Sequence, residues 1–141
     1  MQCERPQLRK RTTTLAWILL LIGSTGAALG QQDVSAKQVP VVDGAEGPCS
    51  VEFTVMDDRG KPVYGATIDV HFAYGFMGVR KLDLQVGTNA DGKARFSGIP
   101  AKVKDGTMFF RASKENLSGT TFYDPSKTCT ARKGINLFEK H

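Results

Sequence analysis

The feature that most constrains the fold is an alternation of apolar and polar residues that runs through the chain from residue 50 onward. In the first segment Val51, Phe53 and Val55 share one face, which is the period of a half-buried β-strand. No helical period follows the N-terminal region. Turn residues separate seven such segments, roughly 8 to 12 residues apart, and we predict strands at 51–56, 67–74, 80–86, 94–96, 107–113, 117–123 and around Ile135 and Leu137. This pattern predicts an all-β, antiparallel sandwich of two packed sheets.

One strand fits either register. For residues 107–113 we place three apolar side chains inward, which leaves Phe109 and Arg111 on the outer face: Met108, Phe110 and Ala112.

The stretch Asp57–Ala66 joins the first two predicted strands. Its first residues supply side-chain acceptors and a glycine, as a tight turn requires. Pro62 cannot donate to a strand ladder, so residues 61–63 are predicted at a sheet edge. Hard cations take oxygen donors, and four residues of the two main turns could be interpreted as calcium ligands: Asp57, Asp58, Asn89 and Asp91. Turn chemistry explains the same residues, so no metal or cofactor is predicted.

The N-terminus has the pattern of a secretory signal. Arg9-Lys10-Arg11 precedes an apolar run at residues 15–22, and Ala28-Leu29-Gly30 presents small residues for cleavage before Gln31. We expect a signal helix in residues 1–30, a flexible leader in 31–48 and one folded domain in 49–141. The alternative is an uncleaved membrane anchor formed by residues 12–32, which carry no charge. Either way we expect export, to the periplasm or the cell exterior.

Export gives the cysteines a role. Cys3 would leave with the signal, so Cys49 and Cys129 remain as one pair in a compartment where disulfides persist. A redox or metal role is not supported, because there is no Cys-x-x-Cys motif. We predict a disulfide.

The charge argues against nucleic-acid binding. The formal net charge is +5, but from residue 31 onward 15 Lys and Arg face 13 Asp and Glu, a net of +2. No basic stripe interleaved with aromatic residues remains, so we expect no nucleic-acid partner, and membrane contact only through the N-terminal segment if it stays uncleaved.

Two motifs carry a family resemblance. Residues 53–70 (FTVMDDRGKPVYGATIDV) and 88–100 (TNADGKARFSGIP) resemble the carboxypeptidase regulatory-like group of prealbumin-type sandwiches, including collagen-adhesin B-type domains. The resemblance covers about residues 50–138 and implies a seven-stranded antiparallel Greek-key β-sandwich. It also implies an accessory, adhesive or carbohydrate-binding-like module more than a reaction.

Three protein families of similar topology have characteristic residues that this chain lacks. Hydroxyisourate hydrolases end in Tyr-Arg-Gly-Ser, whereas this chain ends at His141 without that tail. Intradiol dioxygenases bind iron through two tyrosines and two histidines close in sequence, but His71 and His141 lie far apart. Collagen-adhesin domains join a first-strand lysine to a last-strand asparagine. The first strand here has no lysine, so the resemblance implies that Cys49 and Cys129 tie nearly the same two strands.

The function predicted from these observations is that of an exported, non-enzymatic module for protein or carbohydrate binding, or for a structural role at the cell envelope. The candidate contact surface for an envelope protein or glycan is aromatic and apolar, as interfaces often are: Tyr74, Phe76, Met77 and Phe109. The alternative is a small hydrolase with His71 as base, although the spacing places no serine or cysteine nucleophile beside it.

Overall fold

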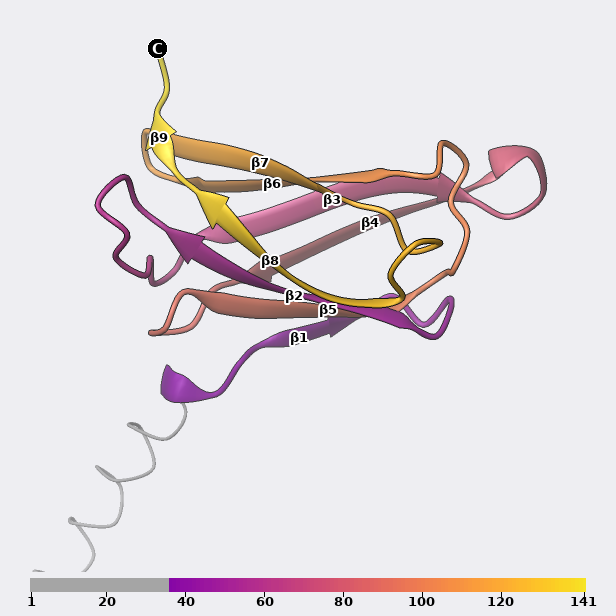
Figure 1. The fold of residues 1–141 in the computed structure, drawn as a ribbon, viewed down its shortest axis with the longest axis horizontal. Helices are drawn as coiled ribbons and strands as arrows, with labels where there is room; N and C mark the ends of the chain where they lie inside the picture. The colour runs from indigo at the N-terminus through magenta and orange to yellow at the C-terminus, as the bar shows by residue number, and fades with distance from the viewer. Residues whose placement is uncertain (1–35) are drawn as a thin grey trace, which may run out of the picture. The chain divides into compact units, whose positions relative to one another are not determined.

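The computed structural model describes residues 36–141, which contain nine strands in two sheets (Figure 1). The predicted signal, its cleavage site and residues 31–35 of the predicted leader lie outside the described residues. One sheet has the order β1-β5-β2-β8, formed by Val41–Asp43, Lys93–Ile99, Cys49–Met56 and Thr130–Asn136. The other has the order β4-β3-β6-β7-β9, formed by Arg80–Gly87, Thr67–Tyr74, Met108–Lys114, Leu117–Tyr123 and Phe138–Glu139.

The prediction of a two-sheet, all-β sandwich is confirmed, but the strand count was wrong. The seven predicted segments correspond to β2–β8. β1 lies in the predicted leader, and β9 follows the last predicted strand. Both additional strands are short and exposed, so they carry too few inward apolar residues to produce an alternation.

The pairing is also not purely antiparallel. β1 pairs with β5 in parallel, and β2 pairs with β8 in parallel from Ser50↔Thr130 to Met56↔Asn136. Parallel partners need long connections, and β8 is distant from β2 in the sequence. The antiparallel prediction was wrong at these pairs, because hydrophobic alternation fixes the face of a residue and not its neighbouring strand.

The core lies between the sheets and uses the predicted inward faces. Phe53, Phe96 and Phe110 are fully buried and form its centre, with ring centroids 4.6 to 5.8 Å apart. Such tilted and edge-on contacts are favourable arrangements for aromatic rings. The register chosen for β6 is confirmed, since Met108, Phe110 and Ala112 are buried while Phe109 and Arg111 are exposed.

The turns have the chemistry that the sequence predicts. Asp57 Oδ1 accepts hydrogen bonds from the backbone N–H groups of Arg59 and Lys61, each at 2.9 Å. Asn89 Oδ1 does the same for Asp91 at 3.0 Å and Lys93 at 2.8 Å. The backbone hydrogen bonds that Asp57 accepts, above all the one from Lys61, hold the pKa of its carboxyl group below the ordinary value. The turn interpretation of Asp57 and Asn89 is therefore confirmed.

The predicted disulfide between Cys49 and Cys129 is present. Cys49 is the first residue of β2, and Cys129 directly precedes β8. Its position beside the Ser50↔Thr130 pair means that it fixes the start of a parallel pairing between distant parts of the chain. Among residues 36–141, no helix is long and apolar enough to cross a membrane.

Candidate functional site

A hollow lies where the C-terminal chain passes from one sheet to the other. β8 ends at Asn136 in the first sheet, Leu137 is buried, and β9 begins at Phe138 in the second. The backbone N–H of Leu137 donates to Met56 O at 2.8 Å, which holds the crossing point on β2. The chain therefore closes one edge of the sandwich at this point.

Close contact between β7 and β8 depends on Gly119. A Cβ atom added there would lie 2.1 Å from the carbonyl oxygen of Asn136, too close for any other residue without backbone movement. β9 then pairs with β7 through Ser118↔Phe138, and the N–H of Lys140 donates to Asn116 O at 2.9 Å. These contacts place the C-terminal side chains beside the outer face of the β6–β7 ladder.

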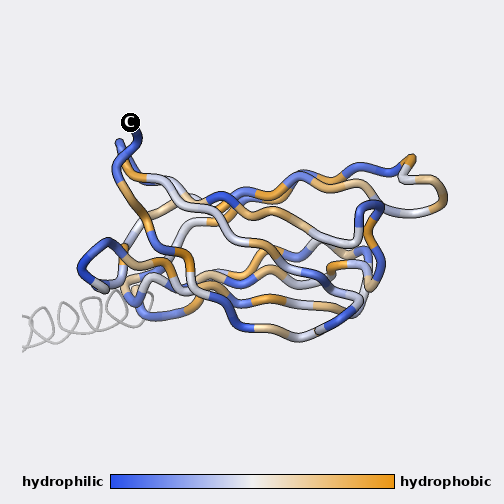
Figure 2. Tube along the Cα trace, turned by 45° about the horizontal axis from the view of Figure 1, so that its top comes forward, coloured by the Kyte–Doolittle hydropathy of each residue, from blue (hydrophilic) through white to orange (hydrophobic). Residues whose placement is uncertain are grey.

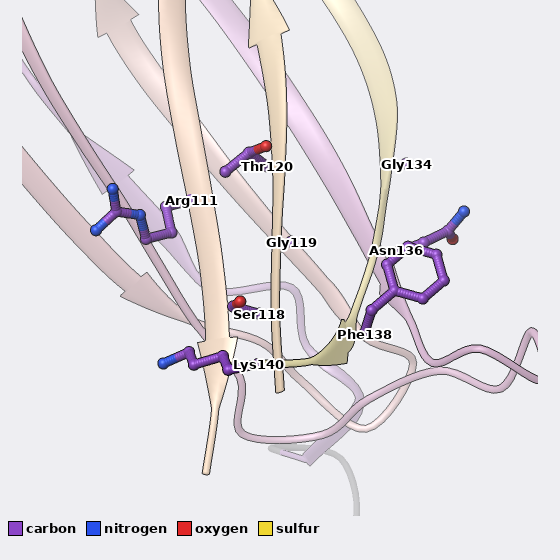
Figure 3. A pocket seen from close by; sticks show the side chains of 8 residues that line it. All are labelled: Arg111, Ser118, Gly119, Thr120, Gly134, Asn136, Phe138 and Lys140. Atoms are coloured by element: carbon purple, nitrogen blue, oxygen red, sulfur yellow. The ribbon is translucent and has the colours of Figure 1, made fainter. Parts of the chain in front are cut away.

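The resulting pocket has a volume of about 650 Å³ and combines basic, polar and aromatic side chains (Figure 3). Arg111 stands on the outer face of β6, directly opposite Thr120 of β7. The residues that line the pocket are Arg111, Ser118, Gly119, Thr120, Gly134, Asn136, Phe138 and Lys140. We refer to it as the β7–β9 pocket.

The charged side chains that line the β7–β9 pocket are all positive. Arg111 and Lys140 are both cationic, and no carboxylate lines the pocket. Asp69 is the register neighbour of Arg111 on β3, but among the described residues no ion pair joins Arg111 or Lys140 to an acid. In Figure 3 the nitrogen atoms of Arg111 and Lys140 extend to one side of β7 and the side chains of Asn136 and Phe138 lie on the other, with the Ser118 and Thr120 hydroxyls between them. The lining of the pocket thus includes positive charge, hydroxyl groups and an aromatic ring.

Sequence reasoning did not identify the β7–β9 pocket. It placed Arg111 on an outer face but gave it no role, and it named none of the other lining residues as site residues. The outward positions of Ser118 and Thr120 follow from the alternation in 117–123. The β7–β9 pairing that brings Phe138 and Lys140 to them has no local signal.

The predicted contact residues are not brought together. Phe76 and Met77 are exposed in the 3-10 turn Phe76–Gly78 that follows β3. Tyr74 is only 8% exposed and packs against Phe72, with ring centroids 5.8 Å apart, so it cannot form part of an exposed surface there. Phe109 is exposed opposite Phe122 on the outer face of the β6–β7 ladder. That Phe76, Met77 and Phe109 contact an envelope protein or glycan stays a prediction.

His71, the residue of the hydrolase alternative, lies outward on β3, and its Nδ1 is hydrogen-bonded to Asp83 Oδ1 on β4. His71 faces away from the core and Tyr74 faces into it, so these two residues lie on opposite faces of one strand. His71 and Tyr74 therefore do not face a common site. Within residues 36–141 no group of three or more His, Cys, Asp or Glu side chains could hold a metal ion.

No protein-family model matches the chain, and no curated protein matches it. Solved structures that resemble it include chlorocatechol 1,2-dioxygenase from Pseudomonas putida, with 16% identity, a TM-score of 0.45, and coverage of 72% of this chain and 67% of the enzyme. Catechol 1,2-dioxygenase from Pseudomonas arvilla C-1 has 20% identity and a TM-score of 0.43, covering 62% and 41%. Hydroxyquinol 1,2-dioxygenase from Pseudomonas putida DLL-E4 has 12% identity and a TM-score of 0.44, covering 74% and 63%.

The chain thus spans between 41% and 67% of the length of these enzymes. At such identities and TM-scores the likeness assigns no substrate or reaction to this chain. The solved structures named above are nevertheless enzymes, and this finding corrects the prediction of a non-enzymatic module, which rested on the family resemblance and on the lack of a catalytic motif.

Proposed function

We propose that the chain recognises a small organic acid that carries an apolar ring, and that the β7–β9 pocket is its binding site. The observation that carries the proposal is that Arg111 and Lys140 line one pocket that no carboxylate lines. Its volume of about 650 Å³ lies within the usual range of small-molecule sites.

Each part of the pocket has a separate role in this proposal. The guanidinium of Arg111 is a planar fork that matches the two oxygens of a carboxylate, and Lys140 adds a second cation. The hydroxyls of Ser118 and Thr120 offer further hydrogen bonds. The ring of Phe138, which is 58% exposed, can stack against an apolar ring of the ligand. An anion without a ring would contact the cations and hydroxyls but would not stack against Phe138.

Titration calorimetry with benzoate tests the proposal, with benzyl alcohol as the neutral ligand of similar shape. We expect saturable benzoate binding that weakens by about tenfold to a hundredfold in Arg111→Gln, because a charge-assisted hydrogen bond contributes roughly 1.5–3 kcal/mol. Lys102→Gln removes an exposed lysine that does not line this pocket and serves as the matched control. The proposal would be rejected if wild type and Arg111→Gln bound benzoate with equal affinity. It would also be rejected if the wild-type protein bound benzyl alcohol as tightly as benzoate.

We further infer that the chain follows the Greek-key path of the carboxypeptidase regulatory-like group. The arrangement around the shared motifs supports this inference: Pro62 forms an isolated antiparallel bridge with Met56, the last residue of β2. A Cβ atom on Gly92, whose φ is +72°, would lie 2.5 Å from Val55 O, so that motif position requires glycine. An experimental structure in which β2–β8 are connected along another path would refute the inference.

We also infer export to the periplasm or cell exterior, directed by residues 1–30. The Cys49–Cys129 disulfide supports it, because such bonds persist in oxidising compartments. N-terminal sequencing of the purified envelope fraction should find Gln31 as the first residue. An intact N-terminus in that fraction would favour the anchor formed by residues 12–32, and recovery of reduced protein from the cytoplasm would exclude export.

A further inference from the structure

The turn after β3 projects an apolar tip away from the two sheets. Phe76, Met77 and Val79 are 84%, 78% and 74% exposed and follow one another closely in the chain. Figure 2 shows this loop extending beyond the neighbouring strands with hydrophobic colours along it, at the opposite end from the chain terminus. Single exposed apolar residues are ordinary, but a group of large ones on a projecting turn indicates a contact surface. We call these three residues the apolar tip.

The backbone holds the apolar tip in an outward conformation. Gly75 and Gly78 have φ values of +79° and +68°, and Met77 between them has φ +56°, which is uncommon for a residue with a side chain. Two hydrogen bonds close the turn, from Gly78 N to Gly75 O at 3.1 Å and from Val79 N to Phe76 O at 3.3 Å. The turn is therefore a defined structure that keeps its apolar side chains in solvent.

Basic residues surround the apolar tip. Residues 75–81 and 101–106 carry four basic side chains and one acidic one, Asp105. Residues 101–106 are held beside the end of β3, because Val103 forms an antiparallel β-bridge with Tyr74 and the N–H of Lys104 donates to Ala73 O at 2.9 Å. Lys102 and Lys104 line one hollow with Met77, and Lys104 lies directly against Gly78.

Among the described residues, one of these four cations forms an ion pair. Arg80 Nη1 lies 3.9 Å from Glu46 Oε2, an exposed contact of small energetic weight. The pKa of Tyr74 below the tip is raised, first by burial and then by Glu46. The surface around the apolar tip thus remains predominantly positive.

We propose that the apolar tip inserts into the surface of a bilayer that contains anionic phospholipids. Apolar side chains that enter the boundary between headgroups and acyl chains, with lysines beside them at the level of the phosphates, are the combination that interfacial binding requires. The proposal concerns the end of the domain opposite the β7–β9 pocket and does not depend on the ligand of that pocket. It also does not depend on the N-terminal segment, so the test must distinguish membrane contact by the apolar tip from membrane contact by the N-terminal segment.

A label placed at the tip makes that separation. Met77→Cys in a Cys3→Ser background provides one reactive thiol, because Cys49 and Cys129 are joined. The full chain, labelled there with an environment-sensitive fluorophore, is mixed with vesicles of phosphatidylcholine alone or with phosphatidylglycerol added. Asp58→Cys in the same background places the label in the exposed turn at the other end of the domain and is the matched control.

We expect the label at position 77 to shift to shorter wavelength and to be quenched by lipid-borne quenchers only on the anionic vesicles, while the label at position 58 stays in water. Phe76→Ser should weaken this response by about tenfold or more, because it removes the largest apolar side chain. Lys102→Ser should weaken it by about fivefold. Oxidised, folded protein is verified for each variant by circular dichroism.

Three results would overturn the proposal. The label at position 77 could stay in water while the chain sediments with the vesicles, which would assign membrane binding to another segment. The same response at position 58 would indicate general adsorption. Shielding at position 77 by soluble envelope proteins but by no vesicle would assign the apolar tip to a protein partner.

Discussion

Replacement of Gly119 by alanine tests whether the close contact between β7 and β8 builds the pocket edge. The new Cβ would lie 2.1 Å from Asn136 O and 3.0 Å from Asn136 C, both backbone atoms that cannot rotate away. Gly119 has no positive φ, so the cost is steric and not conformational. Overpacking of this kind costs roughly 1–3 kcal/mol.

Gly134→Ala is the matched control on the adjacent strand. Its Cβ would meet only Met56 Cε at 3.8 Å and Thr54 O at 3.9 Å, which are ordinary contacts. A glycine-to-alanine change at a compatible site stabilises by about 0.4–1 kcal/mol, because it restricts the unfolded chain. The same substitution at two pocket-lining glycines should therefore change stability in opposite directions.

Thermal unfolding of the oxidised proteins, followed by circular dichroism, measures the difference. With roughly 4–8 °C per kcal/mol for a domain of about this size, Gly119→Ala should lower Tm by several degrees and Gly134→Ala should leave it unchanged or raise it slightly. Gly119→Ala should also weaken benzoate binding, because Asn136 must move. Equal Tm values for the two variants, or a more stable Gly119→Ala, would refute the steric argument and the strand contact on which the pocket depends.

Two further predictions concern the disulfide and a buried tyrosine. Cys49 and Cys129 are 80 residues apart in sequence, and reduction of their disulfide should lower the free energy of unfolding by roughly 4.5 kcal/mol in the chain-entropy model. Urea titrations of the oxidised and the reduced protein measure this difference. A loss below about 1 kcal/mol would contradict the entropic account. Burial, and secondarily Asp124, raises the pKa of Tyr123 from 10.0 to about 12. The neutral form of Tyr123 therefore contributes stability below pH 10 that is lost as the pH rises toward about 12. In an ultraviolet titration of tyrosine ionisation, the step at the highest pH should be absent from Tyr123→Phe. An unchanged titration curve would contradict this assignment.

The sequence predicts this fold best where one face of a strand is fully buried. Val51, Phe53 and Val55 of β2 are completely buried, and the alternation that they create could be recognised without a structure. β9 is different, because Ile135 and Leu137 continue an alternation across the point where the chain changes sheets. A local pattern cannot indicate that the backbone leaves β2 at this point and joins β7.

The candidate site was harder to predict for the same reason. The residues of the β7–β9 pocket come from β6, β7, β8 and the C-terminal segment, and only their pairing brings them together. The cysteines gave the one long-range signal in the sequence, since their pairing places the starts of β2 and β8 side by side. That signal fixes one end of β8, whereas the pocket lies at the other end.

The C-terminal chain connects the disulfide to the pocket through one strand. β8 is paired with β2 over its whole length, from Ser50↔Thr130 next to the disulfide to Met56↔Asn136 at the crossing point. Asn136 is therefore positioned by the first sheet, whereas Arg111 and Thr120 are positioned by β6 and β7 of the second. A ligand that contacts both groups must bridge the two sheets. Reduction of the disulfide would loosen β8 against β2, so it would act on the pocket by displacing Asn136 relative to Arg111 and not by altering any residue that lines the pocket.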